Sequence, residues 1–172
     1  MMRNAEKTSR WREMRVADLS AVARVAAVVH PLYPEADAVF AERLRLYPAG
    51  SRVLVDDAGD IEGYVASHPW MQKSIPTLDS LLGAVPRDAD TYYIHDIALM
   101  PAARGHGAAQ SCVAALAAHA AAAGFATISI VAIAGTQAFW EKQGFRVVDV
   151  PALTAKLASY DSSARYMQRL LA

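Results

Sequence analysis

The feature that most constrains the fold is an abrupt change of pattern in the second half of the chain. Residues 92–99 are almost wholly apolar, which is typical of a strand that is buried on both faces. Gly105 and Gly107 follow, and residues 108–123 are rich in alanine, the strongest helix former, up to a terminal Gly124. This order predicts a buried strand, a glycine-bearing turn and a helix, and thus a chain of the α/β or α+β class.

Patterns along the rest of the chain predict further elements. Hydrophobic spacing predicts strands at residues 11–16, 52–55, 61–67, 125–133, 145–150 and 164–171, and helices at residues 19–29, 35–46 and 136–143. Asp18 is expected to cap the first helix with its carboxylate. Residues 69–91 form a long connection rich in turn formers, in which residues 77–83 fit one or two helical turns. The length and pattern favour one domain over residues 1–172 with a mixed sheet.

Composition and charge argue against several classes of function. The 172 residues carry 17 basic and 17 acidic side chains. This balance argues against a general electrostatic attraction to nucleic acid or an anionic membrane. With the single Cys112 and five widely spaced histidines, the sequence shows neither a disulfide nor metal-ligand spacing. Residues 112–123, the most apolar run, are too short to span a bilayer, and the charged N-terminal sequence does not resemble a secretory signal. We therefore expect a cytoplasmic protein with no metal, nucleic-acid or membrane partner.

The turn between the strand and the helix has the properties of a phosphate-binding loop. Glycine lets the backbone approach a ligand, the first helical turn presents unpaired amides, and Arg104 adds a planar cation. A dinucleotide-binding motif needs a third glycine where Gln110 stands, and an acidic residue about twenty positions later, where residues 125–128 have none. A P-loop needs Gly-Lys followed by Ser or Thr, which is absent. An ordinary tight turn is the simplest alternative.

A third interpretation rests on two motifs. Residues 97–101 read Ile-Ala-Leu-Met-Pro, residues 104–109 continue with Arg-Gly-His-Gly-Ala-Ala, and residues 138–145 read Ala-Phe-Trp-Glu-Lys-Gln-Gly-Phe. These motifs and the order of elements resemble the GNAT N-acetyltransferase superfamily over nearly the whole chain. The resemblance implies the GNAT fold, an α/β (α+β) domain with a mixed, twisted central sheet of about six to seven strands and helices on both faces.

The chain departs from the family pattern at three places. Ala102 stands where members often have Gln or Arg, and residues 134–136 replace an Asn that often contacts the pantetheine arm. Trp140 stands where many members have a tyrosine that acts as general acid. A thiolate with a parent pKa of about 8.5 is a good leaving group, so an acid helps but is not indispensable. Three tyrosines elsewhere in the sequence are candidates for the missing general acid: Tyr33, Tyr93 and Tyr166.

The resemblance implies direct transfer of an acetyl group from acetyl-CoA to an amine of a small molecule or peptide. Backbone groups of Ile97 and Leu99 would pair with the pantetheine arm, and the Leu99 amide would polarise the thioester carbonyl. Phe139 and Trp140 are expected beside the same arm. The pyrophosphate is expected on the loop formed by Arg104, Gly105, His106, Gly107, Ala108 and Ala109.

An amine acceptor calls for a base. An alkyl ammonium with a pKa of about 10.4 costs about 4.6 kcal/mol to deprotonate at pH 7. His95 lies four residues before Leu99 and shares its face of a regular strand, and some family members resemble this chain in using a strand histidine as base. Asp96 is the second candidate and needs a bulge to reach that face. The alternative for His95 is a buried imidazole bonded to the backbone.

The acceptor is expected between the connection of the first two helices and the long loop. Its expected walls are His30, Tyr33, His68 and Trp70, whose rings suit a small amine. Plain loop packing explains these residues equally well. Cys112 has no His–Asp pattern beside it, which favours a small buried thiol over an acyl-enzyme nucleophile.

Further functions stay open at the level of sequence. The same fold is compatible with another acyl-CoA or a hydroxyl acceptor. Trp140 and Ala134 motivate a non-catalytic acyl-CoA-binding module. Many relatives dimerise through their last strands, so a homodimer is open by family analogy alone.

Overall fold

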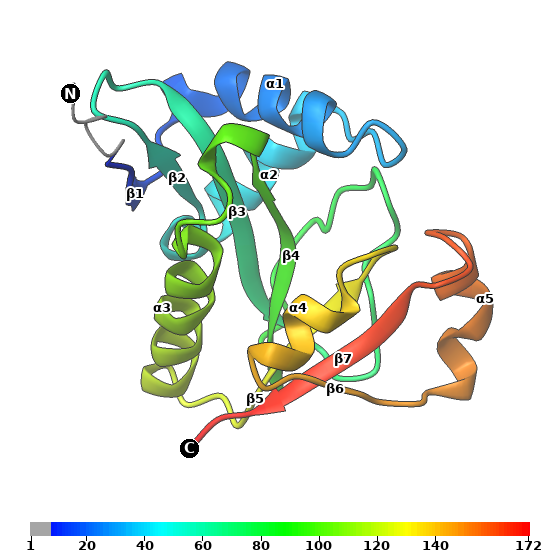
Figure 1. The fold of residues 1–172 in the computed structure, drawn as a ribbon. Helices are drawn as coiled ribbons and strands as arrows, with labels where there is room; N and C mark the ends of the chain where they lie inside the picture. The colour runs from blue at the N-terminus through cyan, green and yellow to red at the C-terminus, as the bar shows by residue number, and fades with distance from the viewer. Residues whose placement is uncertain (1–7) are drawn as a thin grey trace.

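The structure is a computed structural model that describes residues 8–172. Its strands are β1 (Arg10–Glu13), β2 (Arg52–Val55), β3 (Ile61–Trp70), β4 (Thr91–Leu99), β5 (Thr127–Ala132), β6 (Arg146–Val147) and β7 (Arg165–Leu170). Its helices are α1 (Leu19–Val29), α2 (Asp37–Leu46), α3 (Ala108–Ala122), α4 (Gln137–Lys142) and α5 (Thr154–Ala158), as Figure 1 shows. Short 3₁₀ turns lie at Val16–Asp18, Pro48–Gly50, Pro101–Ala103 and Pro151–Leu153.

The strands form one mixed sheet in the order β1-β2-β3-β4-β5-β7-β6. Neighbouring strands are antiparallel except for β4 and β5, which run parallel. A parallel pair needs a crossover, and α3 supplies it. The expected mixed sheet is confirmed, and the glycine-bearing turn lies where β4 passes into α3.

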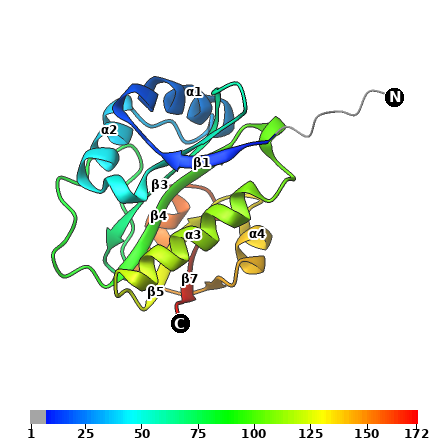
Figure 2. The same cartoon turned by 90° about the vertical axis from the view of Figure 1, so that its left-hand side faces the viewer.

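Helices cover both faces of the sheet (Figure 2). On one face, α1 and α2 bury Val22, Val25 and Phe40 against Val53 and Tyr64 of β2 and β3. On the other face, α3 packs on β4 and β5 through Cys112, Val113, Leu116 and Ala120. The expected helices on both faces are thus present. The alanine-rich sequence of α3 lets this helix lie close to the sheet.

The long connection between β3 and β4 is fixed to α2 by a buried ion pair. Arg43 and Glu42 lie 2.8 Å apart. The Glu42 carboxylate accepts hydrogen bonds from the amides of Leu82 at 2.6 Å and Gly83 at 3.0 Å, and Arg43 donates to the Ser80 carbonyl at 3.1 Å. This connection is therefore held against α2, beside the opening described below.

Two local predictions are wrong. Asp18 does not cap α1: its own dihedral angles are helical (φ −84°, ψ −16°), and its carboxylate binds the Arg12 guanidinium at 2.7 Å and the Arg15 amide at 2.7 Å. Residues 77–83 form no helical turns. Asp79 has a φ of +51°, and amides that a helix would use internally donate to Glu42 instead.

Element bounds also differ from the predictions. The first strand ends at Glu13 instead of residue 16 because a 3₁₀ turn begins at Val16. β6 is only Arg146–Val147, and the five-residue α5 was not predicted because it is too short to show a periodicity. Among residues 8–172, no helix has the length and apolar character needed to cross a membrane.

Candidate active site

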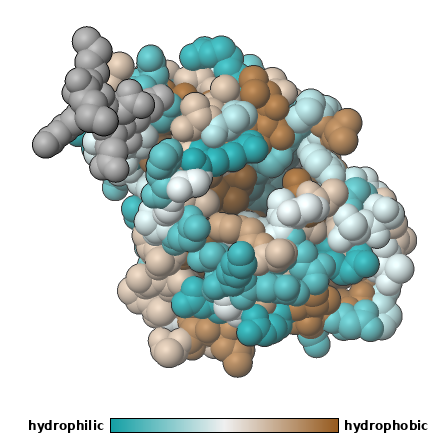
Figure 3. Space-filling view, viewed as in Figure 1, coloured by the Kyte–Doolittle hydropathy of each residue, from teal (hydrophilic) through white to brown (hydrophobic). Residues whose placement is uncertain are grey.

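The central feature of the molecule is an opening in the sheet between β4 and β5. The two strands pair only through residues 92–94 and 128–130, although β4 continues to Leu99 and β5 to Ala132. A cavity of about 740 Å³ lies in this opening, and Figure 3 shows this face hollowed near its middle. That volume is typical of a small-molecule or cofactor site.

The free edge of β4 presents backbone groups to the cavity. The Met100 amide donates to the Glu62 carbonyl of β3 at 2.7 Å. Because amides alternate in direction along an antiparallel strand, those of Ile97 and Leu99 point away from β3. Both residues line the cavity, beyond the point where pairing with β5 ends. An extended ligand can therefore pair with this edge as an added strand.

At the end of β4, the chain enters the glycine-bearing loop. Gly105 and Gly107 both have a φ of +81°, in the region that glycine alone adopts without strain. The second of them immediately precedes α3, whose first amides have no partner within the helix. Ala108 and Ala109 line the cavity, and the Trp11 indole fixes the loop by donating to the Ala108 carbonyl at 2.9 Å. The loop fits a phosphate group.

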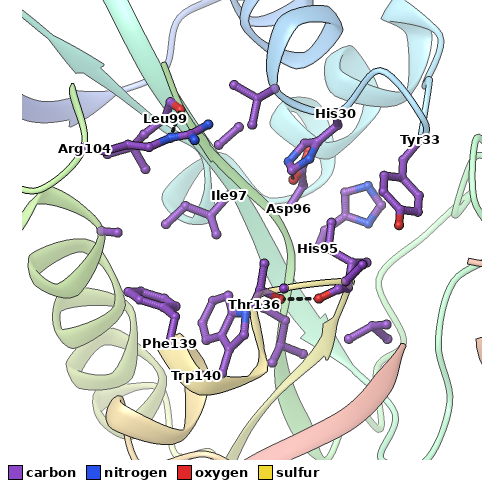
Figure 4. A pocket seen from close by; sticks show the side chains of 18 of the residues that line it. His30, Tyr33, His95, Asp96, Ile97, Leu99, Arg104, Thr136, Phe139 and Trp140 are labelled. Carbon is purple, nitrogen blue, oxygen red and sulfur yellow. Dashed lines mark hydrogen bonds and ion pairs between the residues drawn. The ribbon is translucent and has the colours of Figure 1, made fainter. Parts of the chain in front are cut away.

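Arg104 and His106 lie differently in this loop. The Arg104 Nε donates to the Leu99 carbonyl at 3.0 Å and so places the guanidinium beside the β4 edge (Figure 4). His106 does not line the main cavity; it lines a separate cavity of about 500 Å³ next to Trp11. The structure thus brings the predicted phosphate-loop residues together, with His106 outside the cleft.

His95 and Asp96 both line the cavity because β4 contains a bulge. Ala66 of β3 pairs with Asp96, and the next residue, Ser67, pairs with Ile94. His95 is therefore the extra residue of β4. In a regular strand these two side chains would lie on opposite faces, and the bulge turns both toward the ligand space.

The His95 imidazole is paired with a carboxylate. Its Nε2 lies 2.9 Å from Oε1 and 3.2 Å from Oε2 of Glu35, in the segment that precedes α2. Both side chains are nearly inaccessible to solvent, at 5% and 6% exposed. With Nε2 donating to Glu35, a neutral imidazole leaves its other nitrogen as an acceptor. This arrangement is suited to receiving a proton.

Asp96 is engaged by two other groups. His30 Nε2 lies 2.9 Å from its Oδ1, and the Tyr64 hydroxyl donates to its Oδ2. Burial raises the pKa of Asp96, but the ion pair with His30 and the hydrogen bond from Tyr64 lower it further, and the pKa falls below its usual range. Burial lowers the pKa of His30, but Asp96 raises it by more, and the net shift is upward. The two residues therefore form a neutralised ion pair, and Asp96 is the weaker base.

Across the cavity from β4 lie the aromatic side chains of α4. Trp140 is 3% exposed, lines the cavity and packs edge-on against Phe139 and Phe145 at centroid distances of 5.1 and 5.2 Å (Figure 4). Both predicted residues, Phe139 and Trp140, therefore face the cleft. An indole is a hydrogen-bond donor and not an acid, so Trp140 contributes packing.

Two loops meet at the end of the cavity near His95. The Tyr33 hydroxyl donates to Asp161 Oδ2 at 2.6 Å, and the same oxygen accepts from the Ala134 amide at 3.0 Å. The Tyr160 hydroxyl donates to the Pro76 carbonyl at 2.6 Å. Burial, followed by the bond to Asp161, raises the pKa of Tyr33 to about 12. These bonds tie together segments from both halves of the open sheet.

The Asp161 carboxylate gives a testable pH effect on stability. Burial raises its pKa, but bonds from Ser163, Tyr33 and Ala134 lower it further, to about 2. A lowered pKa stabilises the fold above the unfolded value of about 4, and this contribution is lost as the pH falls toward about 2. Urea unfolding should show a stability gap between wild type and Asp161→Asn that is largest above about pH 4 and closes near pH 2.

The control for this effect is Asp149→Asn, which removes an exposed carboxylate from the loop after β6. Its stability difference from wild type should stay small over the same pH range. A gap for Asp161→Asn that does not change between the two ends of the range would contradict the assignment of these bonds.

Several predicted residues do not reach the cavity. His68 is 1% exposed and packs edge-on against Trp70 at 5.4 Å, and neither side chain lines the cavity. Burial lowers the pKa of His68 to about 3, so its ring is a neutral support behind His95 at 6.3 Å. The Tyr166 hydroxyl donates to Ser129 within the sheet. Burial raises the pKa of Cys112 to about 12, which makes it a core thiol.

Three residues at this end were not identified from the sequence: Glu35, Tyr160 and Asp161. Glu35 pairs with a residue 60 positions away, and Tyr160 and Asp161 lie in a segment without a recognised motif. No local pattern indicates such contacts. Among the described residues, no three His, Cys, Asp or Glu side chains are grouped so that they could hold a metal ion.

Comparisons with known proteins bear on this arrangement. The family model described as "Acetyltransferase (GNAT) family" matches residues 11–145. A comparison with curated proteins found no match. The GphF GNAT-like decarboxylase in complex with isobutyryl-CoA superposes with a TM-score of 0.79 at 17% identity, over 95% of this chain and 100% of the other.

Two other solved structures share the fold. The ribosomal-protein-S18-alanine N-acetyltransferase from Escherichia coli gives a TM-score of 0.67 at 15% identity, over 96% of this chain and 95% of the other. The GNAT family N-acetyltransferase YhbS from Escherichia coli, solved in complex with CoA, gives 0.62 at 18% identity, over 100% of this chain and 86% of the other. The described architecture thus recurs in these proteins.

Proposed function

Because the chain belongs to the acetyltransferase (GNAT) family, we propose that it transfers an acetyl group from acetyl-CoA directly to a primary amine. The single observation that carries this proposal is the opening between β4 and β5. It brings a free strand edge, the glycine-bearing loop and a buried His95–Glu35 pair into one cavity.

The cleft fits the parts of acetyl-CoA in order. The pyrophosphate is assigned to the amides between Arg104 and Ala109 at the N-terminus of α3. The pantetheine arm runs along the free edge of β4, where it pairs with Ile97 and Leu99 opposite Trp140. Relatives solved with CoA or isobutyryl-CoA support a CoA-type ligand in this fold.

In the proposed reaction, His95 accepts a proton from the bound ammonium through the nitrogen that Glu35 leaves free. The amine lone pair then forms a bond to the thioester carbonyl carbon. The Leu99 amide donates to the oxygen on which negative charge develops. The C–S bond breaks, CoA leaves as a thiolate, and the nitrogen loses its second proton to solvent to give the neutral amide. Solvent protonates the sulfur, since Trp140 supplies no acidic proton.

The proposal is tested by following release of the CoA thiol from acetyl-CoA with a panel of amines, amino acids and peptides. Amine-dependent release supports transfer, and calorimetry with CoA reports binding separately. Isobutyryl-CoA belongs in the same assay because one structural relative was solved with it. Tight CoA binding without release by any acceptor would favour a non-catalytic binding module. Loss of CoA binding would overturn the assignment of the cleft.

A further inference from the structure

The charged groups at the far end of the cavity are arranged asymmetrically. Glu35 and Asp96 supply two carboxylates there, and His30 neutralises Asp96 at 2.9 Å. The Glu35–His95 pair then carries a net negative charge when the imidazole is neutral. Among the described residues that line the cavity, Arg104 is the one Lys or Arg. It lies at the opposite end, bound to the Leu99 carbonyl (Figure 4).

A nearby buried cation offsets part of this charge from outside the cavity. Arg43 is 1% exposed and does not line the cavity. Its Nη1 lies 2.8 Å from Glu42, and its Nη2 donates to the Ser80 carbonyl. Its positive charge acts on both Glu35 and Glu42. The carboxylates of Glu35, Asp96 and Glu42 still outnumber the two cations, His30 and Arg43, by one when His95 is neutral. Because Arg43 does not line the cavity, it is not placed to bind an anionic group of a ligand.

The remaining lining at this end is aromatic and apolar. It includes the rings of Tyr33, Tyr93 and Tyr160, together with Pro31 and Leu78. Aromatic faces attract a cation and accept the apolar body of a ligand. Such a lining offers little to a second polar or charged substituent.

The bonds between loops also limit the length of the ligand. Tyr33 joins Asp161 at 2.6 Å, and Tyr160 joins Pro76 at 2.6 Å. These bonds link the segment before α2, the connection before β4 and the segment before β7. A polypeptide that continued past the amine would have to separate them.

From these observations we propose that the acceptor is a compact primary amine that carries no carboxylate. Its ammonium group lies beside the free nitrogen of His95, where the charge of Glu35 and the aromatic rings attract it, and its apolar or aromatic body fills the space near the Tyr33–Asp161 bond. This inference rests on the proposed acetyl transfer. An amino acid places its carboxylate against Glu35 with no cation to receive it.

Matched pairs of acceptors that differ by one carboxylate provide the test: tyramine and tyrosine, phenethylamine and phenylalanine, histamine and histidine. At saturating acetyl-CoA, the amine without the carboxylate should have the higher kcat/KM. The expected ratio is about 10²-fold in the pairs that are turned over, the size of effect that like charges at a buried site produce. Equal rates within the pairs, or equally rapid acetylation of a tetrapeptide amide, would overturn the inference.

Two variants locate the origin of the preference. Glu35→Gln removes the carboxylate charge while leaving an amide oxygen for His95, and the ratio should fall to about 10-fold or less. Asp37→Asn removes a charge two residues away on the exposed surface of α2, outside the cavity, and should leave the ratio unchanged. A ratio that survives in Glu35→Gln would contradict the role given to this carboxylate.

A binding measurement separates this inference from the transfer reaction. Calorimetry on the protein saturated with CoA compares the two members of each pair without requiring turnover. If no acceptor releases thiol but amines bind more tightly than the matching amino acids, the acceptor class stands and acetyl transfer fails. If no amine in the panel binds more tightly than its partner, the acceptor class is overturned.

Discussion

His95→Ala lowers kcat/KM for the best amine by about 10²–10⁴-fold, the range expected for loss of a general base. At pH 7 an alkyl ammonium costs about 4.6 kcal/mol to deprotonate, and the variant removes the imidazole that accepts this proton. The Kd of acetyl-CoA should change little, because the ring lies away from the phosphate loop. Steady-state kinetics and calorimetry check the two parts of this prediction.

The control for this prediction is His119→Gln. His119 lies in α3 outside the cavity and bonds the Tyr47 hydroxyl at 2.8 Å, a contact that glutamine can replace. It should retain wild-type kcat/KM. If His95→Ala keeps most of its activity, the base lies elsewhere, and the His30–Asp96 pair becomes the group to test.

Gly107→Ala weakens CoA binding by about 10-fold or more. The residue has a φ of +81°, and a side chain in the left-handed region costs about 1–2 kcal/mol, which the loop relieves by changing its dihedral angles. That change moves the first amides of α3 away from the pyrophosphate, and 1.4 kcal/mol of lost binding is tenfold in Kd. Calorimetry with CoA measures the effect.

Gly59→Ala is the matched control. Gly59 has a φ of +90° in the turn between β2 and β3, and an added Cβ there meets no atom within 4 Å, as at Gly107. Both variants should lose a similar amount of thermal stability. Only Gly107→Ala should lose affinity for CoA, and equal affinity in the two variants would contradict the assignment of the phosphate loop.

The parts of the fold that could be predicted from the sequence are those that a continuous run of residues of one kind indicates. The buried strand at residues 92–99, the alanine-rich α3 and the intervening glycines are local features, and each is present in the structure. Asp18 shows the limit of local rules. Its position fits a cap, but the competing partner Arg12 comes from the neighbouring strand and binds its carboxylate.

The parts of the candidate site that the backbone of a strand or turn positions could be predicted from the sequence. Ile97, Leu99 and the glycine loop line the cavity because their place depends on the strand and the turn. The bulge at His95 shows only in the register of β4 against β3, which one sequence does not display. The pairing of His95 with Glu35 spans 60 residues and is set by how the segment before α2 packs on the sheet.

The same reason explains the misplaced acceptor walls. Trp70 and His68 lie on β3 beside β4, where the sequence pattern is compatible with either face. His68 lies behind His95 and Trp70 packs against His68, so neither side chain lines the cavity. Asp161, by contrast, lies at the mouth of the cavity because it accepts a hydrogen bond from Tyr33. This contact joins two loops, and no periodic pattern in the sequence indicates it.

The most direct test of acetyl transfer in the β4–β5 cleft is mass spectrometry of the reaction between acetyl-CoA and the best amine, with free thiol counted in the same sample. Direct transfer predicts one acetylated amine for each CoA thiol released, no acetylated protein, and neither product in the absence of enzyme. Thiol release without acetylated amine, or acetyl groups found on Cys112, would contradict direct transfer in the β4–β5 cleft.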